Sequence, residues 1–399
     1  MSRASLPADR SLRDATRLIH EGEARSGFGE MSEALYLTSG YAYDTMEAAE
    51  ARFDGRDPGY IYSRFSNPTV ATFEKRMIAL EGAEAARATA SGMAAVTAAM
   101  LCQLKTGDHV VSARALFGSC RYVVEDLLPR FGVTSTLVDG ADLDQWRAAA
   151  TPQTKVFFLE SPTNPTLEVY DIEAIATIAH EAGALLVVDN VFATPILQKP
   201  LNLGADIVVY SATKHIDGQG RMLGGIVLGS EKFVMDHLHT FMRQTGPSMS
   251  PYNAWVLAKG LETLSLRVER MQENAGRIAD FLADHPKVRK LTYCGRADHP
   301  QAGLVRRQMA GGGTLATFVV DGGKAEAFRF GNALRVIKIS NNLGDAKSIL
   351  THPATTTHQR LSPEDRAAVG ITDATLRLSV GLEHVDDLLE DVETALKAV

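Results

Sequence analysis

The sequence predicts an α/β protein, with a large domain on a mainly parallel, mixed seven-stranded sheet and a smaller α+β C-terminal domain. Short runs of Val, Ile and Leu recur along the chain, and continuous apolar runs are typical of strands covered on both faces. Helical segments separate most of these runs, which indicates helices on both sides of the sheet. A chain of 399 residues is long enough for two or three structural units and a large core.

The first part of the chain predicts an extended arm. Residues 1–65 are rich in Gly, Ser, Tyr and charged side chains, and they contain one helical candidate, "TMEAAEARF" at 45–53. We expect an irregular segment of this length to lie on another surface, such as a neighbouring subunit.

The large α/β domain is expected over residues 66–260. A helix over 69–82 has apolar residues at helical spacing and stops at Gly82. Residues 84–104 predict a short strand, a turn of small residues and an Ala-rich helix. Six further strands are expected at 108–113, 134–139, 155–161, 184–190, 206–212 and 224–230. The last two are too close in the chain for a helical crossover, so the sheet should be mixed.

A long helical stretch, 252–285, leads into the C-terminal domain, which is expected over 261–399. The stretch predicts one or two helices. Beyond it, strands are expected at 313–320, 335–344 and 374–381, and helices at 324–334 and 386–399. Shorter strands and helices in this order indicate an α+β domain.

Composition and charge argue against several classes of protein. The net charge of −7 argues against nucleic acid or an anionic membrane as the main partner. The three cysteines, Cys102, Cys120 and Cys294, are odd in number and form no C-x-x-C pair, which favours cytosolic thiols. The N-terminus lacks the apolar core of a secretory signal, and no apolar run approaches the roughly 18 residues of a membrane span. We therefore expect a cytoplasmic protein.

Two segments place polar groups where strands of the sheet end, and ligands of open α/β sheets bind there. In "TASGMAA" (89–95), the backbone N–H groups of Gly92 and Met93 would face an anion at a helix N-terminus. A plain strand-to-helix turn is the alternative. Asp189 ends the apolar run at 185–190, and a carboxylate buried there needs a positive partner. Its alternative role is a helix N-cap.

The segment "VVYSATKHIDGQGRMLGG" (208–225) presents Lys214 just after another apolar strand. A lysine among small residues and away from water has a lowered pKa and can act as a nucleophile. The neighbouring hydroxyls of Ser211 and Thr213 suit a phosphate. A solvated loop lysine is the alternative. The glycine spacing is G-x-G-x-x-x-G, which does not match a dinucleotide fingerprint and argues against a nicotinamide dehydrogenase.

A fourth segment, "YSRFSNPT" (62–69), contains Tyr62 and Arg64, which could both donate to an anion. An ordinary polar loop is the alternative. Taken together, the four segments describe a pyridoxal phosphate site. A phosphate lies against a helix turn, hydroxyls and an arginine, a carboxylate pairs with the pyridinium nitrogen, and a lysine forms a Schiff base.

Seven segments also form a recognisable set: "YSRFSNPT", "ASGMAA", "LESPTNP", "VVDNVFATP", "YSATKHIDG", "NLGDAKSILTHPATTTH" and "LRLSVGLE". The set resembles the Cys/Met-metabolism pyridoxal phosphate enzymes of fold type I. The resemblance covers about residues 35–395, and the motifs are highly specific in combination. It implies an aspartate-aminotransferase-like fold and a homotetramer built from two tight dimers.

The resemblance implies a role for each matching residue. Lys214 is similar to the Schiff-base lysine and proton shuttle, and Asp189 to the partner of the pyridine nitrogen. Phosphate ligands within one subunit would be Gly92, Met93, Ser211 and Thr213. Tyr62 and Arg64 would be phosphate ligands donated across the dimer, which would explain the extended arm.

Four more residues take roles from the same resemblance. Phe117 occupies the position of the residue stacked on the cofactor ring, and Asn164 resembles the residue near the 3-hydroxyl. Arg377 resembles the arginine that clamps the substrate α-carboxylate. Asn342 replaces a common Ser in the substrate-binding segment.

Three segments, 189–195, 215–221 and 341–345, are most similar to the O-succinylhomoserine sulfhydrylases of this family. The expected activity is a γ-replacement that converts O-succinylhomoserine and sulfide to homocysteine and succinate. A cystathionine γ-synthase and a methionine or cystathionine γ-lyase are the alternatives. Phe117 stands where many relatives have Tyr, so that phenol is missing as an acid for the leaving group, and Ser119 stands where the γ-lyases have Cys, which argues against a lyase.

A metal site is not expected. His352 and His358 are six residues apart and have no acidic companion at ligand spacing. We expect their segment to form a loop near the substrate.

Overall fold

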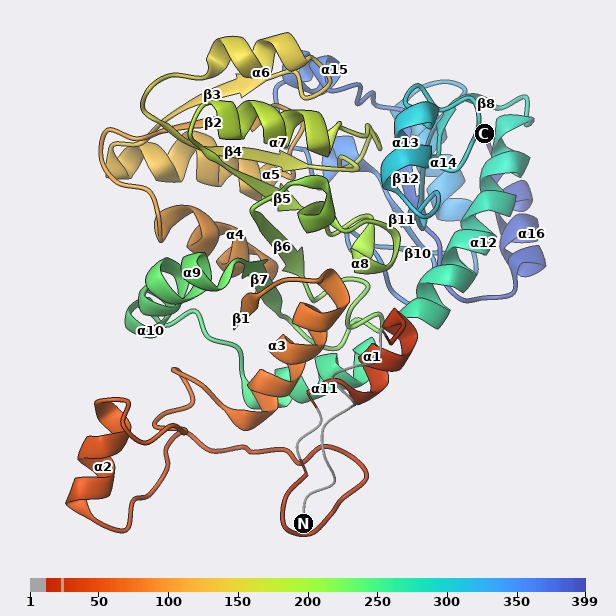
Figure 1. The fold of residues 1–399 in the computed structure, drawn as a ribbon. Coiled ribbons are helices and arrows are strands. Elements are labelled where there is room, and N and C mark those ends of the chain that lie inside the picture. Colours follow the sequence, from red (N-terminus) through yellow and green to blue (C-terminus); the bar gives the residue numbers. More distant parts are fainter. Residues whose placement is uncertain (1–11, 23–24) are drawn as a thin grey trace. The chain divides into compact units, whose positions relative to one another are not determined.

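The computed structural model describes residues 12–22 and 25–399, so residues 1–11 and 23–24 of the predicted arm lie outside the described residues. The fold is α/β, with a mixed seven-stranded sheet and a smaller five-stranded sheet (Figure 1). The chain divides into two compact units. The first comprises Met1–Gln103, Val209–Thr213 and Arg221–Thr263, and the second comprises Leu104–Val208, Lys214–Gly220 and Leu264–Val399. The division into an arm and two domains at residues 65 and 260 stays a prediction.

All seven strands predicted for the large sheet are present. They are β1 Ala85–Thr89, β2 His109–Ala113, β3 Thr134–Val138, β4 Thr154–Glu160, β5 Leu185–Asp189, β6 Ile207–Ser211 and β7 Gly225–Gly229. Their order is β1-β7-β6-β5-β4-β2-β3. β1 pairs with β7 antiparallel, whereas β2 pairs with β3 and β4, and β4 with β5, in parallel. The prediction of a mainly parallel, mixed sheet is therefore confirmed.

The first unit is mainly helical around β1 and β7. Its helices are α1 Asp14–His20, α2 Met46–Phe53, α3 Pro68–Glu81, α4 Gly92–Leu101, α9 Glu231–Phe233, the π-helix Val234–His239, α10 Thr240–Thr245 and α11 Pro251–Leu261. The ends of α3 show why it forms where the sequence predicts. The Asn67 side chain caps its first turn, Pro68 stands in that turn, and Gly82 ends it with a φ of 82°, which favours glycine.

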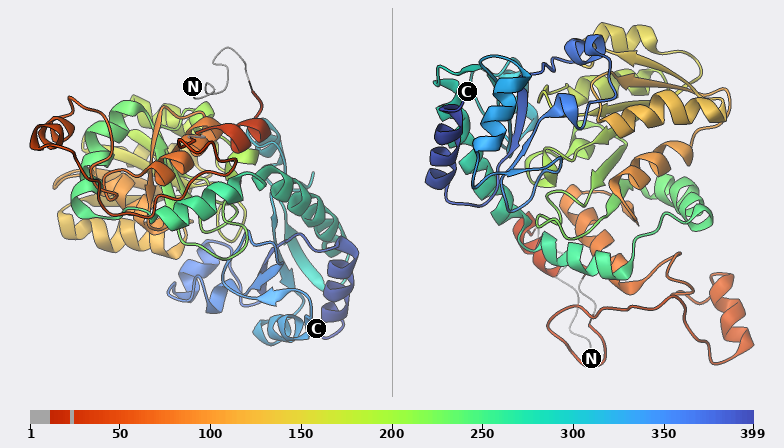
Figure 2. Two further views of the ribbon diagram at one scale, coloured as in Figure 1. Left: turned by 90° about the horizontal axis from the view of Figure 1, so that it is seen from below. Right: turned by 180° about the vertical axis from the view of Figure 1, so that it is seen from behind.

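The part of the predicted arm between α1 and α3 contains α2. In Figures 1 and 2, α2 and the loops beside it extend away from α3 and α11. Several large apolar side chains of the arm are open to solvent, among them Phe28, Met31 and Met46, which are 98%, 81% and 83% exposed. The predicted helix is present as α2, whereas α1 was not predicted.

The first part of the second unit contains the parallel strands. Its helices are α5 Gly118–Tyr122, the π-helix Val123–Leu127, the 3-10 helix Leu128–Phe131, α6 Leu143–Ala149, α7 Ile172–Glu181, α8 Thr194–Leu197 and the 3-10 helix Pro200–Leu203. β4 and β5 are almost entirely buried, as their apolar runs predict. Their register places Glu160 directly beside Asp189, so both strands end in a carboxylate.

The C-terminal part of this unit has a five-stranded sheet in the order β10-β11-β12-β9-β8. Its elements are α12 Leu264–Ala283, β8 Val288–Thr292, α13 Ala302–Gln308, β9 Leu315–Val320, α14 Lys324–Ala333, β10 Lys338–Ile339, β11 Ile349–Thr351, the 3-10 helix Pro353–Thr355, α15 Pro363–Ala368, β12 Thr375–Ser379 and α16 Val385–Leu396. The prediction of one strand over 335–344 was wrong, because only β10 forms and the following loop needs Gly344 at a φ of 71°. Strands β8 and β11 and helices α13 and α15 were not predicted.

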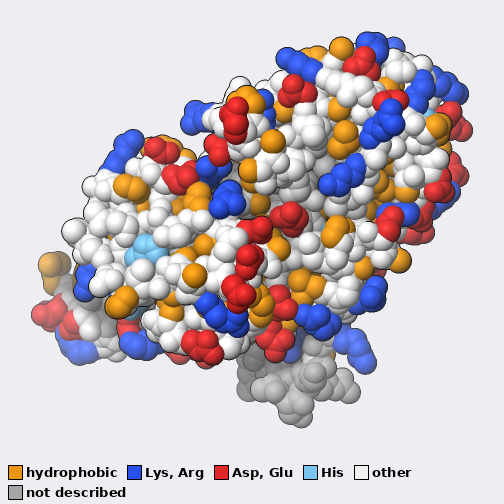
Figure 3. Space-filling model, turned by 90° about the horizontal axis from the view of Figure 1, so that it is seen from above, with side chains coloured by type: hydrophobic (Ala, Val, Ile, Leu, Met, Phe, Trp, Pro, Cys, Tyr) orange, Lys and Arg blue, Asp and Glu red, His pale blue; other side chains and the backbone are white. Residues whose placement is uncertain are grey.

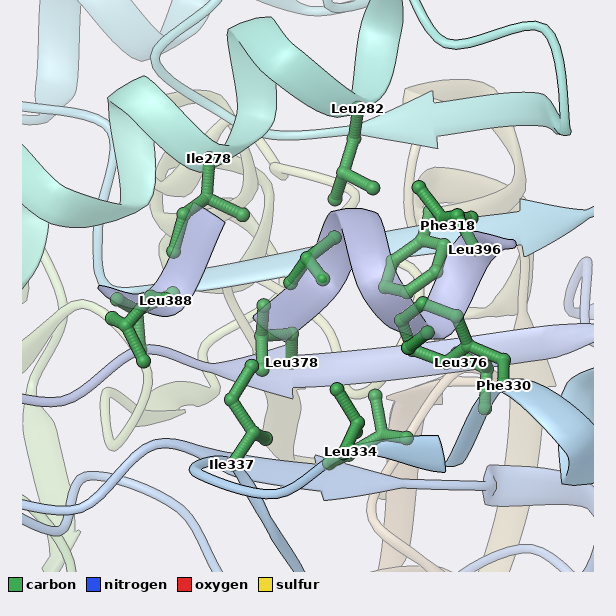
Figure 4. Packing of buried hydrophobic residues seen from close by; sticks show 14 of the residues in the cluster. Ile278, Leu282, Phe318, Phe330, Leu334, Ile337, Leu376, Leu378, Leu388 and Leu396 are labelled. Atoms are coloured by element: carbon green, nitrogen blue, oxygen red, sulfur yellow. The ribbon is translucent and has the colours of Figure 1, made fainter. Parts of the chain in front are cut away.

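Apolar side chains from helices and strands form the core of this C-terminal part. Ile278 and Leu282 of α12 and Leu388 and Leu396 of α16 belong to one cluster that also contains Leu376 and Leu378 of β12 (Figure 4). Phe318 and Phe330 meet edge-to-face with ring centroids 5.5 Å apart. This core accounts for the stability of the five-stranded sheet by burial of apolar surface.

The surface carries both signs of charge. On the face shown in Figure 3, Lys and Arg side chains are interspersed with Asp and Glu. Among the residues that the structure describes, no helix is both long enough and apolar enough to cross a bilayer.

Candidate active site

Two carboxylates lie at the carboxyl ends of β4 and β5. Asp189 ends β5, and its Oδ1 accepts a hydrogen bond from the backbone N–H of Val191 at 3.1 Å. Glu160 ends β4 and is only 5% exposed. Burial raises the pKa of Asp189, and burial together with the Asp189 charge raises the pKa of Glu160. The site therefore holds a carboxyl pair that favours a positively charged partner.

Lys214 lies three residues after β6 and is partly buried. Its Nζ donates to the side-chain oxygen of Asn342 at 2.5 Å. Burial, and then the positive charge of Arg377, lowers the pKa of Lys214 to about 8. The structure thus favours the nucleophile interpretation over a solvated loop lysine, because a larger share of this amine is neutral near physiological pH.

Arg377, in the middle of β12, is 1% exposed and connects several predicted residues. Its Nη1 donates to the side-chain oxygen of Asn164 at 2.7 Å, and its Nη2 donates to the carbonyl of Asn342 at 3.1 Å. Nη2 also donates to the Thr351 hydroxyl at 3.1 Å. The buried Nε has no hydrogen-bond partner among the described residues. An orphaned donor of this kind fits a carboxylate ligand.

Sequence reasoning missed Glu160 as a site residue. Its Oε2 accepts from the backbone N–H of Phe117 at 3.0 Å, and its Oε1 accepts from that of Asn164. The signal that identified Asp189, an acid at the end of a fully apolar strand, also applies to Glu160 in "VFFLE". The structure therefore brings together Phe117, Asn164, Lys214, Asn342 and Arg377 in the second unit, with Glu160 among them.

In the first unit, the turn before α4 comes close to Ser211. The hydroxyl of Ser91 caps this helix by accepting from the N–H of Ala94 at 3.1 Å. A Cβ added at Gly92 would lie 2.5 Å from the Cβ of Ser211, so only glycine leaves room between them. Ser211 ends β6 and is partly buried. A hydroxyl beside the first N–H groups of a helix fits a phosphate.

The other two predicted phosphate ligands within one subunit, Met93 and Thr213, lie in different elements. Met93 follows Gly92 in the first turn of α4. The Thr213 hydroxyl donates to the carbonyl of Gly224 at 3.3 Å and accepts from the Gly224 N–H at 3.1 Å. These two hydrogen bonds join the ends of the loop between Thr213 and Gly224, which contains Lys214.

Tyr62 and Arg64 are not in contact with Gly92 or Ser211 among the described interactions. Tyr62 is 40% exposed and packs edge-on against Phe65, with ring centroids 5.8 Å apart. The Arg64 guanidinium lies over the Phe65 ring, and its Nη1 donates to the backbone carbonyl of Arg243. Within one chain the arm thus presents both side chains on its own surface.

The two histidines of the predicted substrate loop are buried. The ring nitrogens of His352 contact the Thr355 hydroxyl and the Asp373 carbonyl, both at 2.8 Å. Burial, and then the Arg377 charge, lowers the pKa of His358 to about 4. His358 is therefore neutral at physiological pH.

Comparisons with known proteins identify the family of the chain. The family model described as "Cys/Met metabolism PLP-dependent enzyme" matches residues 15–397. The chain is 53% identical over 386 residues to "O-succinylhomoserine sulfhydrylase" of Mycobacterium tuberculosis (strain ATCC 25618 / H37Rv), covering 96% of this chain and 95% of the relative. It is 44% identical over 386 residues to "L-methionine gamma-lyase" of Pseudomonas putida, covering 96% and 97%.

A solved structure extends the similarity to the fold. The "putative O-acetylhomoserine (thiol)-lyase" of Campylobacter jejuni, solved with N'-pyridoxyl-lysine-5'-monophosphate, has a TM-score of 0.92 and 31% identity, and the match covers 97% of this chain and 100% of that one. The family model and the relatives cover nearly the whole chain, including every residue singled out above. The chain therefore belongs to the Cys/Met metabolism PLP-dependent enzymes.

Proposed function

We propose that this enzyme catalyses a γ-replacement, in which O-succinylhomoserine and sulfide give homocysteine and succinate. The observation that carries the proposal is the higher identity to an O-succinylhomoserine sulfhydrylase, 53%, than to an L-methionine gamma-lyase, 44%, over matches of the same length. Phe117 and Ser119, in place of the Tyr and Cys of the γ-lyases, support the same choice.

The enzyme depends on pyridoxal 5'-phosphate, which supplies an electron sink for the pair of electrons left when the substrate loses its α-proton. The residues present fit this group. Gly92, Met93, Ser211 and Thr213 would hold the phosphate, and Lys214 would hold the aldehyde carbon covalently. Asp189 would pair with the ring nitrogen, Phe117 would cover a ring face, and Asn164 would lie near the 3-hydroxyl.

Lys214 would perform the proton transfers. A pKa of about 8 leaves the amine of Lys214 partly neutral near pH 7, so it can accept the α-proton of the substrate and return a proton later. Its hydrogen bond to Asn342 fixes the position of Nζ. Because Phe117 lacks a phenol, the ammonium of Lys214 would also serve as the acid for the departing succinate.

Arg377 would bind the α-carboxylate of the substrate. It is always charged at physiological pH, even though burial lowers its pKa to about 10. The bonds to Asn164 and Asn342 hold the guanidinium plane, and the buried Nε remains to receive a carboxylate oxygen. Orienting the substrate in this way brings its α-carbon to one defined place beside the cofactor.

We also propose that the protein acts as a homotetramer made of two dimers in the cytoplasm. The arm, residues 1–65, would contribute Tyr62 and Arg64 to the phosphate site of the neighbouring subunit. Both side chains are presented by the extended arm, and the exposed Phe28, Met31 and Met46 suit burial against another copy. The large domain, 66–260, would hold the cofactor, and the C-terminal domain, 261–399, would supply Arg377.

The experiment that tests the reaction uses purified enzyme with O-succinyl-, O-acetyl- or O-phosphohomoserine, each with sulfide or with cysteine. Product masses are expected to show homocysteine from the succinyl ester with sulfide as the fastest reaction. Faster turnover with cysteine would instead identify a cystathionine γ-synthase. If 2-oxobutyrate is released from methionine without added sulfide faster than homocysteine forms from the succinyl ester, the enzyme is a lyase.

A further inference from the structure

Glu160 is a buried acid to which the reaction assigns no proton or substrate contact. Its two carboxylate oxygens accept from two different loops. Oε2 accepts the N–H of Phe117, in the loop before α5, and Oε1 accepts the N–H of Asn164, in the loop after β4. One side chain therefore fixes the backbone of two residues that are 47 positions apart in the sequence.

Each of these two residues contacts or carries a group that is proposed to bind a ligand. The side-chain oxygen of Asn164 accepts from Nη1 of Arg377 at 2.7 Å, so the backbone position of Asn164 sets one end of the guanidinium plane. Phe117 carries the ring assigned to the cofactor face, and its backbone N–H is held by the bond to Glu160. A change at Glu160 should therefore displace both groups.

The surroundings of Glu160 are mostly unfavourable to a second negative charge. Asp189 lies beside it in the strand register, Cys120 and Tyr170 are nearby weak acids, and Arg377 is a cation that acts on it. Burying a carboxylate in such surroundings costs free energy unless its oxygens accept hydrogen bonds. A neutral or apolar side chain would be easier to bury at this position.

We infer that Glu160 is a positioning residue, whose carboxylate holds Phe117 for the cofactor and Asn164, and through it Arg377, for the carboxylate of the amino-acid substrate. The inference rests on the proposed roles of Phe117, Asn164 and Arg377 but not on the identity of the acyl group. It predicts that loss of Glu160 weakens binding of cofactor and amino acid together.

The test compares wild type with Glu160→Gln, which keeps the volume but offers only one acceptor oxygen to the two N–H groups. The dissociation constant of pyridoxal 5'-phosphate is measured by titrating apoprotein, and that of L-norleucine by the absorbance change of the loaded enzyme. L-norleucine is an α-amino acid without a leaving group on its γ-carbon. We expect both dissociation constants to rise about tenfold, as for a buried N–H group left without its hydrogen-bond acceptor.

The matched control is Asp391→Asn. Asp391 is also a buried carboxylate that accepts three backbone N–H bonds, from Arg335, Val336 and Ile337, but these belong to the loop before β10. We expect this variant to lower the melting temperature and to leave both dissociation constants unchanged.

Glu160→Asp, which keeps the charge but is too short to reach both loops, replaces Glu160→Gln if the latter fails to fold, with the same expected rises. The inference is overturned if the folded Glu160 variant binds both ligands within twofold of wild type. Failure of wild type to convert O-succinylhomoserine would overturn the proposed reaction alone, because neither binding measurement depends on the acyl group.

Discussion

The carboxyl ends of β4 and β5 and the core of the five-stranded sheet differ in the side chains that they contain, because one region is rich in charged groups and the other is apolar. The C-terminal core is made of Leu, Ile and Phe side chains packed between α12, α16 and the sheet. The site at the ends of β4 and β5 instead contains buried Glu160 and, from β12, buried Arg377, with Asp189 beside Glu160 in the strand register. Apolar burial favours the folded state, whereas buried charge opposes it unless every partner is present.

This difference predicts that the apolar core mainly determines stability, whereas the strand ends mainly determine ligand binding and catalysis. A substitution in the apolar core should change the free energy of unfolding and leave ligand affinity alone. A substitution at the strand ends should change affinity or rate first. Four experiments test this separation, in order of decreasing expected effect.

Lys214→Ala should abolish turnover, with a fall in kcat of at least about 10³-fold, because the amine is the proposed nucleophile and proton carrier. The measurement is homocysteine formation together with the visible absorbance of the purified protein, which should lose the band of covalently held cofactor. Lys338→Ala removes an exposed lysine of β10 and should change neither. A Lys214→Ala protein that kept the band would contradict the assignment.

Phe330→Ala should lower the free energy of unfolding by about 3–5 kcal/mol, because it leaves a cavity beside Phe318 in the C-terminal core. The measurement is denaturant unfolding, paired with the KM for the amino acid at a temperature where the variant is folded. KM should stay the same. Leu266→Ala, on the exposed face of α12, should cost about 0.5 kcal/mol or less.

A large rise in KM for Phe330→Ala would show that the two regions are coupled rather than separate.

Arg377→Lys should raise the KM for the amino-acid substrate by about 10–100-fold, because an ammonium cannot reproduce the guanidinium bonds to Asn164, Asn342 and Thr351. The fall in kcat should be smaller. Steady-state kinetics measures both. Arg289→Lys, at an exposed pair with Asp321, serves as the control. An unchanged KM in the Arg377 variant would argue against the clamp role.

The apoprotein should lose stability as the pH rises from about 6.5 to 8. The raised pKa of Glu160 means that the folded state binds more protons than the unfolded state above the ordinary carboxyl range, so the free energy of unfolding falls as those protons leave. The slope should be at most about 1.4 kcal/mol per pH unit for each such proton. Urea unfolding at several pH values measures it, and Glu160→Gln should flatten the slope. The same slope in the variant would assign the effect to other groups.

Below about pH 6.5, a different set of groups makes the free energy of unfolding fall as the pH falls. Burial lowers the pKa of His215 to about 3 and that of His358 to about 4, so the unfolded state takes up protons first and stability is lost as the pH falls.

Local patterns were enough to predict most of the large sheet. β4, β5, β6 and β7 are short, largely apolar runs, and such runs are typical of strands covered on both faces, whereas β1 and β3 are more polar and less buried. The same reasoning failed at β10, because the loop at Asn342 is held by contacts with Lys214 and Arg377 that lie far away in the sequence. It also missed β8 and β11, which are short or partly exposed.

The sequence by itself determined the class of fold, the strands of the large sheet, and the residue types that mark a pyridoxal phosphate enzyme, because hydrophobic period and residue chemistry are local properties of a chain. Only the tertiary structure decided that Glu160 lies beside Asp189, that Asn342 accepts a hydrogen bond from Lys214, and that Nε of Arg377 has no partner within residues 12–22 and 25–399. These facts depend on strand register and loop closure, which join residues distant in sequence and arise only when the chain packs.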